Sequence, residues 1–224
     1  MRHQIYRTMA LGMTLAGALA LAGQSAEAAL MINEVLFNPG GLDANGDGVV
    51  SASGDEFVEL VNTDTLPILL NGWSLKDALS TRHAFGPTAI VPGLGFLVVF
   101  GGGTPTGIDN AFIASTGTLS LNNSGDTVSL LDSSSALVDQ LIYNQSLSGV
   151  SLTRFPDGAG SFVNHHTVSA LDFSPGLTTE GARQLATPEQ HPDPIVPEPS
   201  TWWLFGMPLT LAMLTPWRPR LRIS

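Results

Sequence analysis

The segment whose residue types most suggest chemistry is Asp43-Ala44-Asn45-Gly46-Asp47-Gly48-Val49-Val50-Ser51. Counted from Asp43, it has side-chain oxygens at positions 1, 3, 5 and 9 and a glycine at position 6, as in the calcium loop of an EF-hand. The pattern is incomplete, because Gly54 stands at position 12, where a glutamate normally binds calcium through both oxygens. The candidate calcium ligands are Asp43, Asn45, Asp47, Val49, Ser51, Asp55 and Glu56.

The same stretch can also be read as an acidic, turn-rich insertion. The segments on either side of it have the alternating pattern of strands, whereas an EF-hand loop lies between two helices. Both interpretations stay open at this point. Calcium is the only cofactor that the sequence suggests.

Catalytic residues are harder to find. The chain has no cysteine, which excludes thiolate chemistry and cysteine-bound zinc. It has no Gly-x-Ser-x-Gly motif, and the glycines at 101–103 lack the lysine of a phosphate-binding loop. The bases available outside the N-terminal segment are His83, His165, His166 and His191. We expect His165 and His166 to lie in an exposed loop, and we expect no enzymatic activity.

The N-terminal residues predict export. Two arginines precede an apolar stretch from Met9 to Gly23, and Ala26-Glu27-Ala28 follows it. This order of positive, apolar and small residues is that of a secretory signal peptide. We predict a signal peptide over residues 1–28, cut by signal peptidase after Ala28.

The C-terminal residues predict a second targeting segment. Residues 180–199 form a proline-rich linker, and residues 202–217 are apolar, with tryptophans at both borders and three arginines behind them. Such a segment fits a short transmembrane helix with a cytoplasmic tail, although Pro208 and Pro216 interrupt it.

Residues 196–224 resemble the PEP-CTERM sorting signal, carried here by Val196, Pro197, Glu198 and Pro199 ahead of the apolar stretch and the arginines. The resemblance implies processing by an exosortase in the inner membrane of a Gram-negative bacterium, usually of a species that makes exopolysaccharide. The tail would hold the protein in the membrane before processing.

Between these ends, short apolar runs separated by turns predict an all-β sandwich. The expected strands are Ala29–Phe37, Glu56–Asn62, Leu69–Leu75, Arg82–Phe85, Phe96–Phe100, Thr118–Leu121, Thr127–Asp132, Leu137–Tyr143 and Ser151–Arg154. We expect Trp73 to pack in the core and Arg154 to pair with a carboxylate.

Six phrases in order resemble the lamin-tail domain, an immunoglobulin-like β-sandwich, over residues 30–179. They begin at Ile32, Asp55, Leu70, Leu119, Gly149 and Phe173 and include Asn-Glu-Val, Asp-Glu-Phe-Val-Glu-Leu-Val-Asn and Phe-Ser-Pro-Gly. The resemblance implies a fold that mediates binding or attachment, and no reaction.

The net charge of the mature protein limits the classes of partner that it can bind. Residues 29–199 contain four basic and 18 acidic residues, a net charge of −14. Such a surface repels phosphate backbones, so we expect no nucleic-acid binding. The two resemblances together imply a non-enzymatic protein at the cell surface, outer membrane or extracellular matrix, with exopolysaccharide or a surface protein as partner. The alternative is an exported hydrolase or an accessory subunit of an extracellular enzyme.

Overall fold

The computed structural model of the chain describes residues 29–145 and 147–185. Within these residues the fold is all-β, and its only helical element is the 3₁₀ turn η1 (His165–Thr167). The expected signal peptide, Val196–Pro199 motif and apolar tail lie outside the described residues. Within them, no helix is both long and apolar enough to cross a membrane.

The larger sheet has six strands in the order β12-β11-β1-β2-β7-β8. All of its pairs are antiparallel except β7 with β8. The strands are β1 (Leu30–Leu36), β2 (Phe57–Asn62), β7 (Phe96–Phe100), β8 (Ala111–Ile113), β11 (Leu152–Phe155) and β12 (Ser161–Asn164). The late strand β11 therefore lies beside the first strand, near the middle of the sheet.

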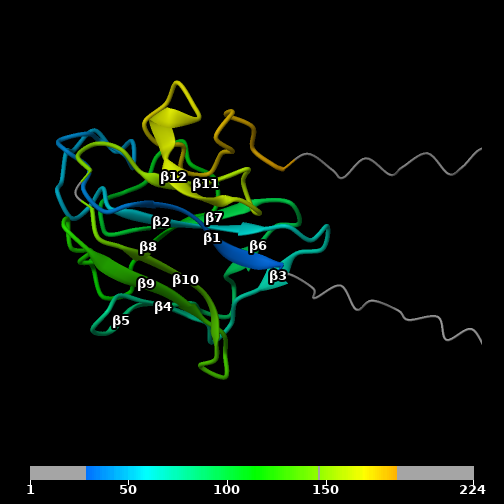
Figure 1. Cartoon of the computed structure of the whole chain (residues 1–224). Coiled ribbons are helices and arrows are strands. Elements are labelled where there is room, and N and C mark those ends of the chain that lie inside the picture. Colours follow the sequence, from blue (N-terminus) through cyan, green and yellow to red (C-terminus); the bar gives the residue numbers. More distant parts are fainter. Residues whose placement is uncertain (1–28, 146, 186–224) are drawn as a thin grey trace, which may run out of the picture. The chain divides into compact units, whose positions relative to one another are not determined.

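A four-stranded sheet in the order β10-β9-β4-β5 forms the second layer, below the first in Figure 1. Its strands are β4 (Ser74–Lys76), β5 (Thr81–Ala84), β9 (Asp126–Leu131) and β10 (Leu137–Tyr143). A small pair, β3 (Ile68–Leu69) with β6 (Ile90–Val91), lies at one end.

The main core fills the space between the two sheets, because alternate residues of each strand point inward. Val58 and Leu60 of β2 belong to it, whereas Phe57 and Val61 pack on the opposite face of the same sheet. The larger sheet is thus buried on both faces, and every residue of β1, β2 and β7 is buried.

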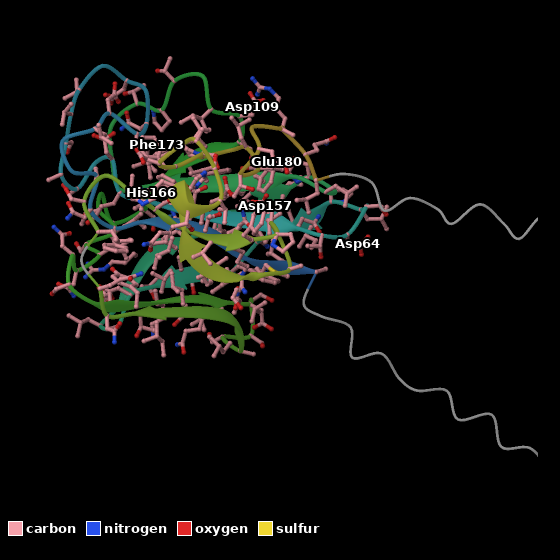
Figure 2. The ribbon with its side chains drawn as sticks, turned by 45° about the horizontal axis from the view of Figure 1, so that its top comes forward. Asp64, Asp109, Asp157, His166, Phe173 and Glu180 are labelled. Atoms are coloured by element: carbon pink, nitrogen blue, oxygen red, sulfur yellow. The ribbon has the colours of Figure 1, made fainter. Side chains whose placement is uncertain are left out.

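Residues 172–185, which we call the C-terminal cover, lie on the outer face of the larger sheet. Phe173 packs against the cluster that includes Phe57, and Leu185 packs against Phe96. The amide of Leu185 donates to the carbonyl of Leu94 at 2.8 Å. Figure 2 shows the face that carries the cover, with Phe173 and Glu180 labelled. The packed chain therefore continues past residue 179, where the resemblance to the lamin-tail domain ended.

Two of the predicted strands are wrong. Leu69–Leu75 is interrupted by a turn in which Trp73 N bonds to Leu70 O at 2.9 Å and Gly72 has a φ of 82°. Thr118–Leu121 contains no strand, because Ser120 has a positive φ of 52°, although Leu119 and Leu121 still point into the core.

Trp73 packs against the main core from the turn before β4. Core packing of this residue is therefore confirmed, although the turn rather than a strand positions it. The strands β6, β8 and β12 were not predicted.

Candidate functional site

The acidic loop, residues 43–55, folds back on itself through its own side chains. The carboxylate of Asp43 accepts hydrogen bonds from the amides of Asp47 at 3.2 Å and Gly48 at 2.8 Å, and Asn45 Oδ1 accepts one from Asp47 N at 3.0 Å. Gly48 has a φ of 85°, which favours glycine at this sharp turn. Asp43, Asn45 and Asp47 are therefore brought into one turn, as expected.

Asp55 lies inside this loop as its anchor. It is fully buried, and its Oδ1 accepts hydrogen bonds from the amides of Ala44 at 2.9 Å and Asn45 at 3.0 Å. Its Oδ2 accepts one from Ser51 N at 2.7 Å. One carboxylate thus satisfies the buried amides of Ala44 and Asn45 and the partly buried amide of Ser51.

The loop is also fixed to the segment that follows β7. Asp47 Oδ2 accepts a hydrogen bond from Thr104 N at 2.8 Å, and Asn45 O accepts one from Thr106 N at 2.9 Å. Val49 and Ser51 contribute to local turns: Val49 N donates to Asp47 Oδ1 and Ser51 Oγ accepts from Gly54 N.

Glu56 does not join the other candidate ligands. Its Oε2 accepts a hydrogen bond from Leu121 N at 3.3 Å. Burial raises its pKa to about 8, against weaker lowering by the amides of Leu121 and Ser120. Among the described residues, no three His, Asp or Glu side chains gather closely enough to hold a metal. A calcium site here would have to draw on Asn45 and backbone oxygens as well as the acids.

The structure corrects the expectation for His165, which is fully buried. Its Nδ1 lies 3.3 Å from Ser151 Oγ and 3.2 Å from Glu34 Oε1. Ser151 Oγ donates to the same Glu34 oxygen at 2.6 Å. The histidine is buried because β11 brings Ser151 next to β1 and η1 places His165 over them, an arrangement that a local pattern does not show. His166 is exposed, as expected.

This Ser, His and Glu cluster does not have the geometry of a catalytic triad. In a triad the hydroxyl contacts His Nε2 and the acid contacts Nδ1. Here both contacts are at Nδ1, and Nε2 has no hydrogen-bond partner among the described residues. Ser151 and Glu34 are fully buried as well, so no substrate reaches the hydroxyl. The cluster holds the cover in place, since Ser174 N and Ser174 Oγ both donate to Glu34 at 3.0 Å.

A second buried carboxylate lies beside the first. Glu59 accepts hydrogen bonds from Asn33 Nδ2 at 2.9 Å and from the amide of Gly176, in the cover, at 2.6 Å. Burial, and then repulsion from Glu34, raise the pKa of Glu59 well above its usual range. Asn33 also donates to Asp157 at 3.0 Å, which ties the turn after β11 to the same network.

Sequence reasoning missed this buried network, although its members were in view. Asn33, Glu34, Glu59, Ser151 and Ser174 all belong to the phrases that carry the family resemblance. The available signal was the presence of polar side chains inside otherwise apolar strands, since such groups are buried only with hydrogen-bond partners.

Arg154 pairs with a carboxylate, as predicted. Its Nη2 lies 3.0 and 3.1 Å from the two oxygens of Asp139, on β10 of the opposite sheet. The Asp139 carboxylate also accepts a hydrogen bond from Ile32 N at 2.8 Å. The ion pair therefore joins the two sheets along one side of the sandwich.

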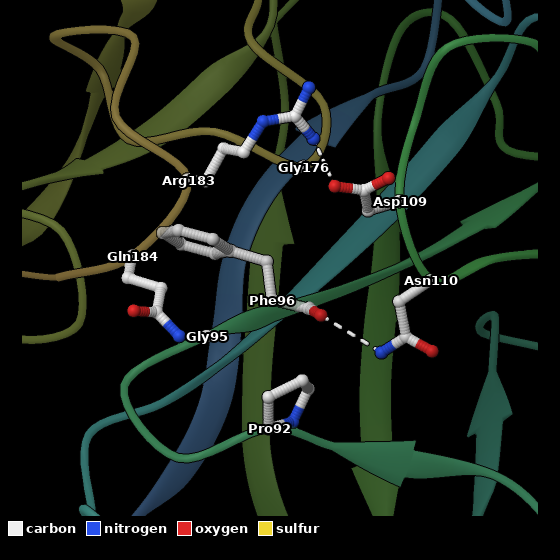
Figure 3. Close-up of a pocket in the computed structure, with 8 residues that line it drawn as sticks. All are labelled: Pro92, Gly95, Phe96, Asp109, Asn110, Gly176, Arg183 and Gln184. Carbon is white, nitrogen blue, oxygen red and sulfur yellow. Dashed lines mark hydrogen bonds and ion pairs between the residues drawn. The ribbon is translucent and has the colours of Figure 1, made fainter.

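Two adjoining hollows run beside β7 and share Asp109, Gly176 and Arg183 as walls. We call them together the Arg183 groove. The first, drawn in Figure 3, has a volume of about 520 Å³ and lies over Phe96. The second, of about 290 Å³, extends to Asp43 in the acidic loop. The ion pair between Arg183 and Asp109 separates them.

Comparison with known proteins gives one clear result. No curated protein matches the chain. The family model described as Lamin Tail Domain matches residues 23–145, more than half of the chain. With the all-β, immunoglobulin-like sandwich described above, this match is decisive. The chain belongs to the lamin tail domain family.

Proposed function

We propose that the protein is an exported, non-enzymatic binding or attachment module of a bacterial cell surface or extracellular matrix. Signal peptidase cuts the chain near Ala28, and an exosortase processes the tail that follows Pro199. The support for export is the order of charged, apolar and small residues at the N-terminus, and the order of Val196–Pro199, apolar stretch and arginines at the C-terminus.

One structural observation carries the attachment role. Leu185, from which the chain continues to the tail, is held at Leu94, just before β7 begins. The acidic loop is held at Gly102 and Thr104, just after β7 ends. A domain tethered through its C-terminal end therefore presents the acidic loop at the opposite end of β7, where a partner can reach it.

The buried cluster supports a binding role over a hydrolytic one. Ser151, His165 and Glu34 are the described residues that most resemble catalytic machinery, yet all three are fully buried and they lack the order of contacts that acyl transfer needs.

The test is to follow the protein through export. Mass spectrometry of the protein recovered from cell fractions and medium is expected to find an N-terminus within a few residues of Ala29 and loss of the segment after Pro199. Deleting residues 200–224 is expected to shift the protein between surface and medium. An intact Met1 on exported protein, or an unchanged distribution after the deletion, contradicts the proposal.

We also propose that the acidic loop binds calcium weakly. The supporting observation is that the turn brings the Asp43 and Asp47 carboxylates together, with each of their oxygens accepting one amide hydrogen bond and keeping a second lone pair for a cation. Because Glu56 is turned away, water would complete the shell, and the affinity would be low.

A further inference from the structure

The Arg183 groove has the dimensions of a small-molecule site. Its larger hollow, at about 520 Å³, falls within the roughly 300–1,000 Å³ of typical ligand pockets. The smaller hollow continues past the ion pair, so the two together form an elongated site rather than a single pit.

Arg183, Asp109 and the amides of Gln184 and Asn110 place planar polar groups on the walls, and together these groups offer both hydrogen-bond donors and acceptors. Gln184 is exposed on the wall of the larger hollow, and its amide can both donate and accept. Arg183 supplies donors and Asp109 supplies acceptors. Asn110 shapes the opposite wall, because its amide nitrogen is committed to the carbonyls of Ile90 and Phe96, each at 2.9 Å.

The floor is formed by less polar surface. Pro92 is exposed at the larger hollow, above the buried Gly95 and Phe96, and the half-buried Phe173 and Pro175 line the smaller one. Figure 3 shows the Phe96 ring between Gln184 and Asn110, below the ion pair. A ligand that places C–H groups on this floor and hydroxyls toward the walls would match both surfaces.

Charge disfavours a simple anion or a simple cation between Asp109 and Arg183. The ionisable side chains on the groove walls are Asp43, Asp109 and Arg183, so two carboxylates face one guanidinium. An anion would meet repulsion from these acids and from a strongly acidic domain. A simple cation would have to displace Arg183 from Asp109. A hydroxyl group can donate to the carboxylate while accepting from the guanidinium, and neighbouring hydroxyls can do both at once.

The ion pair can open without much loss to the fold. The side chains of Arg183 and Asp109 are 65% and 77% exposed, and exposed ion pairs contribute little to stability. A ligand can therefore insert hydroxyls between them and pass from one hollow to the other.

We propose that the Arg183 groove binds a neutral oligosaccharide of at least two sugar units, through its hydroxyls to Asp109, Arg183 and Gln184. This inference rests on the proposed attachment function and names the class of its ligand.

The experiment uses the purified full-length protein in detergent and an array of short oligomers of glucose, mannose, galactose and xylose, with oligomers of uronic acids alongside. We expect saturable binding to at least one neutral oligomer. Asp109→Ala removes a charged hydrogen bond and is expected to weaken binding roughly tenfold, and Gln184→Ala roughly fivefold. The matched control is Glu180→Ala, which removes an exposed acid of the same cover outside the two hollows.

Three results would overturn the inference: no binding to any neutral oligomer, binding to uronic acid oligomers alone, or binding that Asp109→Ala and Gln184→Ala leave as strong as Glu180→Ala does. The proposed export is tested separately by the cell fractions. A protein that reaches the surface and binds no sugar keeps the proposed function and loses this ligand. A protein that binds a neutral sugar oligomer but is never exported keeps this ligand and loses the proposed function.

Discussion

Glu34 and Glu59 lie directly opposite each other on the paired strands β1 and β2, and both side chains are fully buried. Two carboxylates so close together in the interior cannot both be ionised without large cost. The cover donates the amide and hydroxyl of Ser174 to Glu34 and the amide of Gly176 to Glu59. Burial, and then repulsion from Glu34, raise the pKa of Glu59. The two glutamates therefore link β1 and β2 to Ser174 and Gly176, which follow them by 140 and 117 positions along the chain.

The free energy of unfolding should fall as the pH rises from about 6.5 to 8. Burial raises the pKa of Glu56 from its ordinary 4.5 to about 8, and that of Glu59 is also raised. The folded protein holds a proton on Glu56 that the unfolded chain has released, so this group lowers the free energy of unfolding by about 1.4 kcal/mol per pH unit until the pH nears 8, and Glu59 acts in the same direction. His83 opposes this below its ordinary value of 6.5, because burial lowers its pKa. Urea unfolding of residues 29–186 at several pH values measures the slope.

A variant isolates the contribution of Glu56. Glu56→Gln keeps an acceptor for Leu121 N but has no titrating proton. The free energy of unfolding should therefore fall less steeply above pH 6.5, by the contribution of about one proton. Glu180→Gln changes an exposed acid and should leave the slope as it is. A Glu56→Gln slope equal to that of the wild type would show that Glu56 is ionised in the folded protein.

Asp139→Ala should destabilise the domain by about 3 kcal/mol, because it leaves Arg154 and the amide of Ile32 without their shared partner. Each side chain of this ion pair is only 17% exposed. Asp109→Ala also breaks an arginine pair, but an exposed one, and should cost less than about 1 kcal/mol. Chemical denaturation compares the two, and equal losses would mean that the Asp139 pair does not join the sheets in solution.

Calcium should raise the unfolding midpoint of the wild type. We expect a dissociation constant on the order of 0.1 to 1 mM, typical of extracellular modules, because the position-12 glutamate is missing. At about 100 times that concentration, calcium would add up to roughly 2.7 kcal/mol. Thermal unfolding with calcium, magnesium or chelator is to be compared with Asp43→Ala and Asp47→Ala. If calcium has no effect, or the same effect in all three proteins, the loop is an acidic turn that binds no metal.

The strands that could be predicted are those with a strong local pattern. Phe96–Phe100 and Leu137–Tyr143 have the predicted bounds, because apolar runs or alternation mark them clearly. Thr118–Leu121 also alternates polar and apolar residues but bends at Ser120, whose positive φ is set by its surroundings and not by its residue type. Strands as short as β6 and β8 exist only because a neighbour pairs with them.

The site residues also divide into those that a local pattern reveals and those that only long-range pairing brings together. The acidic loop could be predicted because its side chains bond to amides within a few positions of themselves. The buried network could not, because Glu34 meets Ser151, His165 and Ser174 only after β11 has inserted beside β1. The separation along the chain is the physical reason that His165 was expected to be exposed.

The segment after the family match should be required for folding. The match ends at residue 145, yet β11 pairs with β1, and Leu152 of β11 lies in the main core. A chain of residues 29–145 would leave an edge of β1 unpaired and Glu34 and Glu59 without the donors of Ser151, Ser174 and Gly176. We expect residues 29–186 to unfold cooperatively, and residues 29–145 to bind a hydrophobic dye and melt without a transition.

A chain of residues 29–171 separates the effect of the strands from that of the cover. It keeps β11 and β12 but loses Phe173, Ser174 and Leu185, which close the outer face of the sheet. It should fold with a lower midpoint, because two apolar clusters and a buried carboxylate pair become exposed. Calorimetry of the three chains measures this order. A midpoint for residues 29–171 equal to that of residues 29–186 would show that the cover lies on the sheet without stabilising it.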